Sequence, residues 1–200
     1  YATCPDYPSL ENAHLAHGCE AIRIQVCNMN RELIQALYAQ GVRYICTRSI
    51  GTEHIDMQTV RELGMRASHA VYSPESVANY AIMLMLMCCR KLPYVLDRAK
   101  LQDFSLQGKR GRELSKMTVG VIGLGRIGRT VARHLSGFGC RLMGYDVYAT
   151  AEAKALCEVT DLDTIYRECD VITLHCPATA DNHHMLDAAA IARMKPGVII

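Results

Sequence analysis

Three glycines spaced as Gly-x-Gly-x-x-Gly carry the clearest chemical signal in the chain. Gly123, Gly125 and Gly128 follow the apolar run Met117–Ile122 and open the amphipathic stretch Arg126–Leu135. In a strand–turn–helix of this kind, the first glycine permits a sharp turn and the second lets the backbone approach a pyrophosphate. The third allows the helix to pack closely on the strand. The spacing therefore predicts a dinucleotide-binding loop.

The residues around this loop predict which dinucleotide it binds. The backbone N–H groups of Arg126 and Ile127 would face the phosphates at a helix N-terminus, where unpaired donors and the helix dipole favour an anion. Asp146 ends the next apolar run. A carboxylate there accepts hydrogen bonds from the adenosine ribose hydroxyls and repels a 2′-phosphate. The following Val147 and Tyr148 offer no arginine for that phosphate, so we predict NAD rather than NADP as cofactor.

Composition and charge exclude several classes of partner. The 200 residues carry a formal net charge of +2, and half of them are apolar. The one basic cluster, Lys109–Arg112, is followed at once by Glu113 and indicates a solvated loop, so no nucleic-acid partner is predicted. The longest apolar stretch, Ala81–Cys89, is shorter than the roughly 20 residues that a membrane span needs. We expect a soluble protein with no membrane partner.

The cysteines and histidines predict no metal site. The chain has ten cysteines but no Cys-x-x-Cys pair, and several lie in apolar runs where a free thiol acts as a small hydrophobic group. Buried reduced thiols favour a cytoplasmic location. His183 and His184 lack a third ligand at suitable spacing, and adjacent loop residues rarely point the same way.

Short apolar runs alternate with amphipathic segments in two series, which is typical of α/β proteins with parallel sheets covered on both faces. Strands are predicted at residues 21–27, 42–47, 65–70, 117–122, 141–145 and 171–176, with another starting at 198. Helices are predicted at residues 29–40, 56–63, 126–135, 162–169 and 187–194. Residues 94–116 are mixed and polar, and we expect them to form a crossing segment.

A long helix separates the two series. Ser73-Pro74-Glu75 is a strong helix start, and the helix should end near Arg90. It is apolar on almost every side over Ala81–Cys89, so both sides should be buried, either between domains or between subunits.

Taken together, these segments resemble the D-isomer-specific 2-hydroxyacid dehydrogenases, in particular the D-lactate dehydrogenase branch that includes the vancomycin-resistance enzymes. The resemblance runs from about Gly18 to Ile200. The segments that carry it are residues 44–51 (YICTRSIG), 54–56 (HID), 71–78 (VYSPESVA), 108–114 (GKRGREL), the glycine loop and 173–177 (TLHCP).

The resemblance implies a two-domain organisation. Residues 1–95 would form an incomplete, flavodoxin-like substrate domain, and residues 96–200 a Rossmann-type NAD domain truncated at its C-terminal end. It also implies a homodimer, for which the helix Ser76–Arg90 is the natural contact. The partner would be a small 2-hydroxy or 2-keto acid, most simply D-lactate and pyruvate.

Three residues match substrate-side positions of the family. The turn at Ile50 and Gly51 would offer backbone N–H groups to the substrate carboxylate, as a backbone nest binds an anion without a charged side chain. Tyr72 matches a tyrosine near the substrate. The alternatives are an ordinary turn after a strand and a half-buried tyrosine beside a helix start.

Further positions match the cofactor side. Cys176 and Pro177 would line the adenine and ribose end, although Cys176 departs from the more common Val or Ala. Asn182 would bind the cofactor side of the cleft, or would simply be a polar loop residue. His175 ends a buried strand and is either a cofactor contact or a structural histidine.

No catalytic residue is assigned within the chain. The family's Arg, Glu and His belong to segments that should begin just after Ile200. The chain starts at Tyr1 and stops within the apolar run Val198–Ile200, so we expect a fragment that is inactive alone. Two alternatives stay open: a non-catalytic NAD-binding regulatory module on the same fold, and a dehydrogenase for another 2-hydroxy acid.

Overall fold

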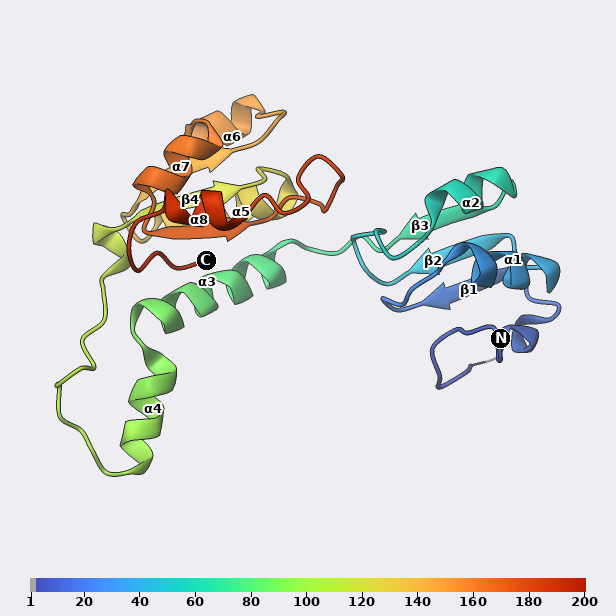
Figure 1. The fold of residues 1–200 in the computed structure, drawn as a ribbon, viewed down its shortest axis with the longest axis horizontal. Coiled ribbons are helices and arrows are strands. Elements are labelled where there is room, and N and C mark those ends of the chain that lie inside the picture. The colour runs from blue at the N-terminus through green and yellow to red at the C-terminus, as the bar shows by residue number, and fades with distance from the viewer. Residues whose placement is uncertain (1–2) are drawn as a thin grey trace. The chain divides into compact units, whose positions relative to one another are not determined.

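The chain forms two compact units, Tyr1–Tyr72 and Ser73–Ile200, in a computed structural model that describes residues 3–200. Figure 1 labels the helices and strands of each unit. The division lies earlier than the expected boundary after residue 95, because the long helix α3 (Glu75–Cys89) packs against α5 (Arg126–Ser136) of the second unit. Its core-facing residues are Ala78, Ile82, Met85 and Cys89.

The first unit is a small parallel sheet in the order β1-β2-β3. Its elements are η1 (Ala13–Ala16), β1 (Ala21–Ile24), α1 (Arg31–Ala39), β2 (Tyr44–Thr47), α2 (Met57–Glu62) and β3 (Arg66–His69). Side chains start both α-helices: Asn30 accepts the Leu33 amide, and Asp56 accepts the Gln58 and Thr59 amides.

Within the described residues, this first sheet is covered on one face only, which corrects the expectation of two covered faces. Ile24 and Ile45 lie in the core with α1 and α2, whereas Arg23, Tyr44 and Ser68 on the other face are exposed. The strand order explains this. Two successive right-handed crossovers that step in the same direction place both helices on the same side of a sheet.

The second unit is built on a four-stranded parallel sheet in the order β6-β5-β4-β7. Besides α3 and α5, its elements are α4 (Leu92–Lys100), η2 (Leu114–Lys116), β4 (Thr118–Ile122), β5 (Arg141–Tyr145), α6 (Ala151–Leu156), β6 (Glu158–Val159), α7 (Leu162–Glu168), β7 (Val171–Leu174) and α8 (Ala188–Ala192). After β7 the chain adds one parallel bridge, from Ile199 to Val171, where a new strand was predicted. The prediction of two α/β units with parallel sheets is confirmed.

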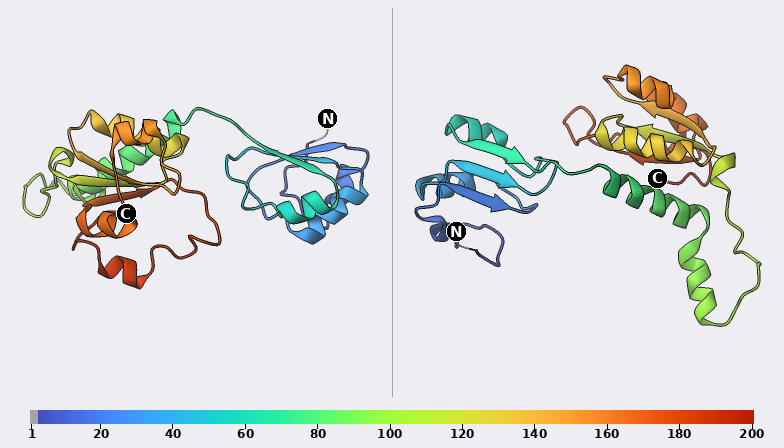
Figure 2. Two further views of the ribbon diagram at one scale, coloured as in Figure 1. Left: turned by 90° about the horizontal axis from the view of Figure 1, so that it is seen from above. Right: turned by 180° about the vertical axis from the view of Figure 1, so that it is seen from behind.

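Both faces of the second sheet are covered. Helices α3, α5 and α6 pack on one face, with Val119, Val121 and Leu135 among the buried residues. On the opposite face, Ile165 of α7 and Ala190 of α8 lie in a second apolar cluster. Figure 2 shows these two layers from further directions.

The strand order also creates a switch point at β4. The chain steps from β4 to β5 and β6 in one direction, and then returns past them to β7 on the other side of β4. In open parallel sheets, a crevice forms at the carboxyl end of the strand where this reversal occurs. The glycine loop, residues 123–128, follows β4 directly and therefore lies at this end of the sheet.

Residues 92–100 form a helix, which overlaps the start of the crossing segment predicted over residues 94–116. Pro93 occupies the first turn of α4, where proline is tolerated. Lys91, in the left-handed conformation with φ 52°, separates the two helices. None of the α4 residues is buried, and Figure 1 shows the helix extending away from the sheet.

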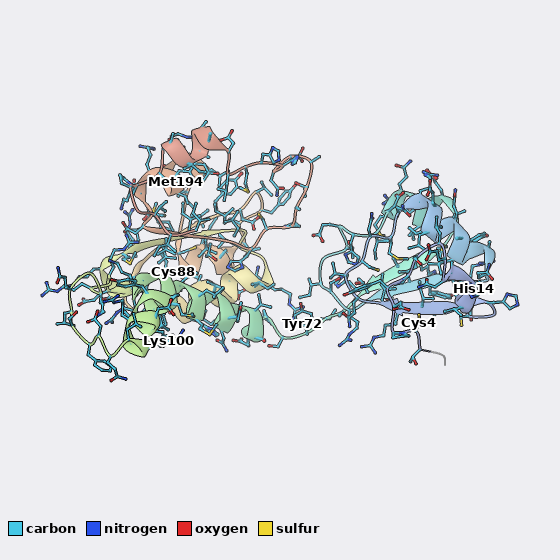
Figure 3. The ribbon with its side chains drawn as sticks, turned by 60° about the horizontal axis from the view of Figure 1, so that its bottom comes forward. Cys4, His14, Tyr72, Cys88, Lys100 and Met194 are labelled. Carbon is cyan, nitrogen blue, oxygen red and sulfur yellow. The ribbon has the colours of Figure 1, made fainter. Side chains whose placement is uncertain are left out.

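In the chain alone, α3 is not buried on every side, and its expected burial between domains or between subunits stays a prediction. Tyr80, Met83 and Leu84 are exposed, while Figure 3 places Cys88 near the end of the same helix. One face of α3 lies in the core and the other is open. Among residues 3–200, no helix combines the length and apolar character needed to cross a bilayer.

Candidate functional site

Two of the three loop glycines are required by the protein itself. Gly123 has a φ of +89°, and its N–H donates to the Tyr145 carbonyl at 2.8 Å. A Cβ on Gly123 would lie 2.5 Å from the Cys176 amide nitrogen, and a Cβ on Gly128 would collide with the Gly123 carbonyl oxygen. Because these two residues lack a side chain, the first turn of α5 packs closely against the end of β4 and the start of the segment after β7.

Gly125 differs from its two neighbours because nothing in the protein requires a glycine there. Its φ is −68°, and no atom lies within 4 Å of the position that a Cβ would occupy. The missing side chain instead leaves open space over the loop. This space is where the sequence predicts a pyrophosphate, so the residues present fit the group.

The N-terminus of α5 offers donors without a cap of its own. Helices α1, α7 and α8 each begin with a side chain that accepts a first-turn amide, whereas Gly125 supplies none to α5. The first turn of α5 also holds no acidic residue, and it begins with Arg126. A positive charge at this end opposes the helix dipole, and an anion bound to the amides of Arg126 and Ile127 would offset both costs.

Asp146 has a second task that sequence reasoning missed. Its Oδ2 accepts the Leu124 amide at 2.6 Å, and its Oδ1 accepts the Tyr148 amide at 2.8 Å. A carboxylate has about four acceptor positions, so two remain for ribose hydroxyls. The carboxylate that is predicted to bind the ribose therefore also fixes the middle of the glycine loop.

The contacts of His175 favour the structural alternative. Its Nε2 lies 2.9 Å from the Thr173 hydroxyl, and its backbone amide donates to the Ile122 carbonyl at 2.7 Å. Burial lowers the pKa of the His175 imidazole, because a charged ring would lose its hydration. The ring is therefore neutral near physiological pH and orders the end of β7 beside Gly123.

The segment after β7 is braced by its own side chains. The Asn182 amide donates to the Pro177 carbonyl at 2.7 Å, and its oxygen accepts the Thr179 amide at 2.8 Å. Cys176 lies against Gly123, so it reaches the loop through its backbone. The geometry gives Asn182 a structural role, while the cofactor contacts of Cys176, Pro177 and Asn182 stay predictions.

In the first unit, a polar network lies under the turn at Ile50 and Gly51. The buried Thr47 hydroxyl lies 3.1 Å from His54 Nε2 and 2.7 Å from the Ser49 hydroxyl, which donates to the Gly51 carbonyl at 2.7 Å. No acceptor among residues 3–200 takes the amide of Ile50 or Gly51. The side chains of Thr47 and Ser49 thus fix the turn, and the amides of Ile50 and Gly51 remain as donors that an anion could accept from.

Two further observations concern the residues that are predicted to bind the substrate. The Glu53 carboxylate lies where a Cβ of Gly51 would point, so a negative charge sits beside the turn that is predicted to bind a carboxylate. Glu53 is exposed and free to swing away. Tyr72 is 43% exposed and ends the first unit (Figure 3), and its substrate contact stays a prediction.

The described residues contain no group of three or more His, Cys, Asp or Glu side chains arranged to hold a metal ion. The rings of His183 and His184 do lie together, with centroids 3.8 Å apart, although adjacent loop residues were expected to point apart.

Comparison with known proteins gives a consistent result. The family profile for the NAD binding domain of D-isomer specific 2-hydroxyacid dehydrogenases matches residues 82–200, which lie within the second unit. An aromatic 2-oxoacid reductase of Clostridium sporogenes is 42% identical over 98% of this chain and 60% of its own length. A D-lactate dehydrogenase of Escherichia coli is 40% identical over 95% of this chain and 59% of its own length.

A solved structure agrees with these sequence relatives. The D-lactate dehydrogenase of Aquifex aeolicus, in complex with NAD and lactic acid, matches this chain with a TM-score of 0.87 and 36% identity. The match covers 93% of this chain and 56% of that protein. The chain thus spans about 60% of the length of the curated relatives it matches.

Gly125→Ala should separate cofactor binding from folding. Because the protein leaves room for the methyl group, the free energy of unfolding should change by less than about 0.5 kcal/mol. The methyl group should displace the pyrophosphate and weaken NADH binding by about tenfold or more. Gly137→Ala, at the other end of α5 with its nearest contact at 3.5 Å, is the control and should change neither. Unaltered NADH affinity in Gly125→Ala would contradict the site.

Proposed function

Because the chain belongs to the D-isomer specific 2-hydroxyacid dehydrogenase family, we propose that the complete gene product interconverts a D-2-hydroxy acid and its 2-keto acid with NAD. We take D-lactate and pyruvate as the substrate pair. The observation that supports this most is the glycine loop, where Gly125 leaves open space above uncapped amides of α5.

In this proposal, the described residues would hold the cofactor and the substrate in position and compensate their negative charges. Bound NAD would carry the hydride, which is the cofactor's own chemistry. The amides of Arg126 and Ile127 would hold its pyrophosphate, and Asp146 would orient the adenosine ribose. In the first unit, the amides of Ile50 and Gly51 would bind the substrate carboxylate, with Thr47 and Ser49 holding the turn. No acid or base for the proton transfer is assigned among residues 1–200.

Two alternative functions are an enzyme for a larger 2-keto acid and a non-catalytic NAD-binding module. The relative from Clostridium sporogenes is named an aromatic 2-oxoacid reductase, which favours a larger 2-keto acid. A non-catalytic NAD-binding module on the same fold would keep the glycine loop and lack turnover. A pyruvate substrate is supported by the relative named D-lactate dehydrogenase and by the resemblance at Tyr72 and the Ile50–Gly51 turn.

The complete gene product should oxidise NADH in the presence of pyruvate, and its kcat/KM should exceed that for phenylpyruvate by about tenfold or more, the ratio for roughly 1.4 kcal/mol of transition-state binding. Absorbance of NADH measures both rates. A reversed ranking would assign an aromatic 2-keto acid instead. Intact NADH binding without turnover of any 2-keto acid would overturn the enzymatic proposal in favour of the binding module.

Asp146→Ala should narrow the preference for NADH over NADPH. Loss of the contact with Leu124 should loosen the loop and weaken the binding of NADH and NADPH equally. Loss of the carboxylate also removes the repulsion of the 2′-phosphate, and this second effect favours only NADPH. The ratio of the two dissociation constants isolates the second effect and should fall by about tenfold. Fluorescence titration with both cofactors measures it, and an unchanged ratio would show that Asp146 does not meet the ribose.

We further propose that α3 forms a homodimer contact, in a protein of the cytoplasm. Tyr80 and Leu84 of α3 are exposed, and a groove lined mostly by apolar residues follows this helix in the second unit. Its apolar lining residues are Ile82, Met83, Leu86, Met87, Leu92 and Phe138. A second copy of the chain would remove this surface from water, which is the main favourable term in protein association.

Met83→Glu should convert the dimer to a monomer at micromolar concentration, because the new carboxylate would be moved from water into a mostly apolar contact. Met83 is 43% exposed in the chain alone, so the variant should still fold. Leu10→Glu, on an exposed leucine of the first unit, is the control and should leave the dimer intact. Light scattering after size exclusion measures the mass. A dimeric Met83→Glu protein would contradict the contact.

A further inference from the structure

The peptide groups of Leu124 are held on both sides by charged side chains. Its N–H donates to Asp146 Oδ2 at 2.6 Å, and its carbonyl accepts from Arg129 Nη1 at 2.9 Å. The Leu124 side chain is buried, at 2% exposure, so it anchors the residue from a third direction. Leu124 lies between Gly123 and Gly125, the two residues around which the loop turns.

Arg129 is itself held by a residue of another helix. Its Nε lies 3.1 Å from Glu152 Oε2, in the first turn of α6, and its side chain is only 22% exposed. Arg129 thus spans from Glu152 to the Leu124 carbonyl, with two of its donors in fixed use. The guanidinium plane holds its donors in a rigid fork, so fixing one contact fixes the direction of the other.

The direction of the Leu124 carbonyl determines the direction of the next amide. The peptide between Leu124 and Gly125 is planar and trans, so its N–H points opposite to its C=O. With the carbonyl held by Arg129, the Gly125 N–H is turned away from Arg129. Rotation of this peptide would redirect the amide and carry a carbonyl oxygen toward the pyrophosphate position, where it would repel the anion.

We propose that Arg129, held by Glu152, is a positioning residue for the glycine loop: it fixes the Leu124–Gly125 peptide in the orientation that binds the dinucleotide pyrophosphate. The inference rests on NAD binding by the second unit and not on the identity of the keto acid. Arg129 acts through the peptide, since its Nη1 and Nε face the Leu124 carbonyl and Glu152.

The chain offers a matched control on the same helix. Arg133 lies one turn further along α5, and its Nη2 is 3.1 Å from the other carboxylate oxygen of Glu152. It makes no contact with the loop among its described hydrogen bonds. Arg129→Met and Arg133→Met each remove one positive charge and one ion pair to Glu152, but only Arg129→Met releases the Leu124 carbonyl.

Fluorescence titration of the complete protein with NADH tests the proposal. Arg129→Met should raise the dissociation constant about tenfold, and Arg133→Met by less than about twofold. Arg129→Lys should stay close to Arg129→Met, because an ammonium keeps the charge without the fork. Thermal unfolding of the unliganded protein should occur at a somewhat lower temperature in Arg129→Met than in Arg133→Met, since Arg129 is the less exposed of the two and also loses its contact with Leu124. Both variants should stay folded at the temperature of the titration.

Three results would overturn the proposal. Equal NADH affinity of Arg129→Met and Arg133→Met would show that long-range charge alone matters. Full affinity of Arg129→Lys would show that the charge, and not the orientation of the peptide, supports binding. Unfolding of the unliganded Arg129→Met protein at the temperature of the titration, with Arg133→Met still folded, would show that Arg129 has a general structural role instead. If the unmodified protein fails to bind NADH, NAD binding itself is refuted, which is a separate failure.

Discussion

The contact of Gly128 with the Gly123 carbonyl is the constraint on which the rest of the structure depends. Only a hydrogen at Gly128 lets α5 start this close to the end of β4, and only a glycine adopts the φ of +89° at Gly123. This turn places the amide end of α5 at the switch point of the β6-β5-β4-β7 sheet. A helix that began further away would present the same amides to water and not to a bound phosphate.

The parts of the site that the sequence predicted are those that local chemistry determines. The glycine spacing and the apolar strand before it were sufficient to place the loop, because Gly123 and Gly128 meet local steric requirements and Gly125 leaves space over the loop. Asp146 was found because it ends a strand at a known spacing from the loop. Its hydrogen bond to Leu124, and the bridge from Glu152 through Arg129, join residues from separate elements, so no sequence period indicates them.

Other differences follow from tertiary context. A second helix, α4, follows the predicted end of α3 near Arg90, because a single left-handed residue at Lys91 allows it to start and Pro93 is tolerated in its first turn. The sheet of the first unit is covered on one face since α1 and α2 both cross in the same direction, which depends on strand order and not on any one segment. The polar network of Thr47, Ser49 and His54 could likewise not be predicted from the sequence, because its hydrogen bonds form only when the turn brings these side chains together.

The identity of the keto acid does not follow from the sequence, because relatives named for lactate and for aromatic 2-oxoacids both match the chain at about 40% identity.

A crystal structure of the complete protein with NADH tests the central claim most directly, because it locates the pyrophosphate. The account predicts pyrophosphate oxygens within hydrogen-bonding distance of the Arg126 and Ile127 amides, above Gly125, and a ribose hydroxyl on Asp146. A pyrophosphate bound elsewhere, or a loop in which a side chain fills the space over Gly125, would contradict it.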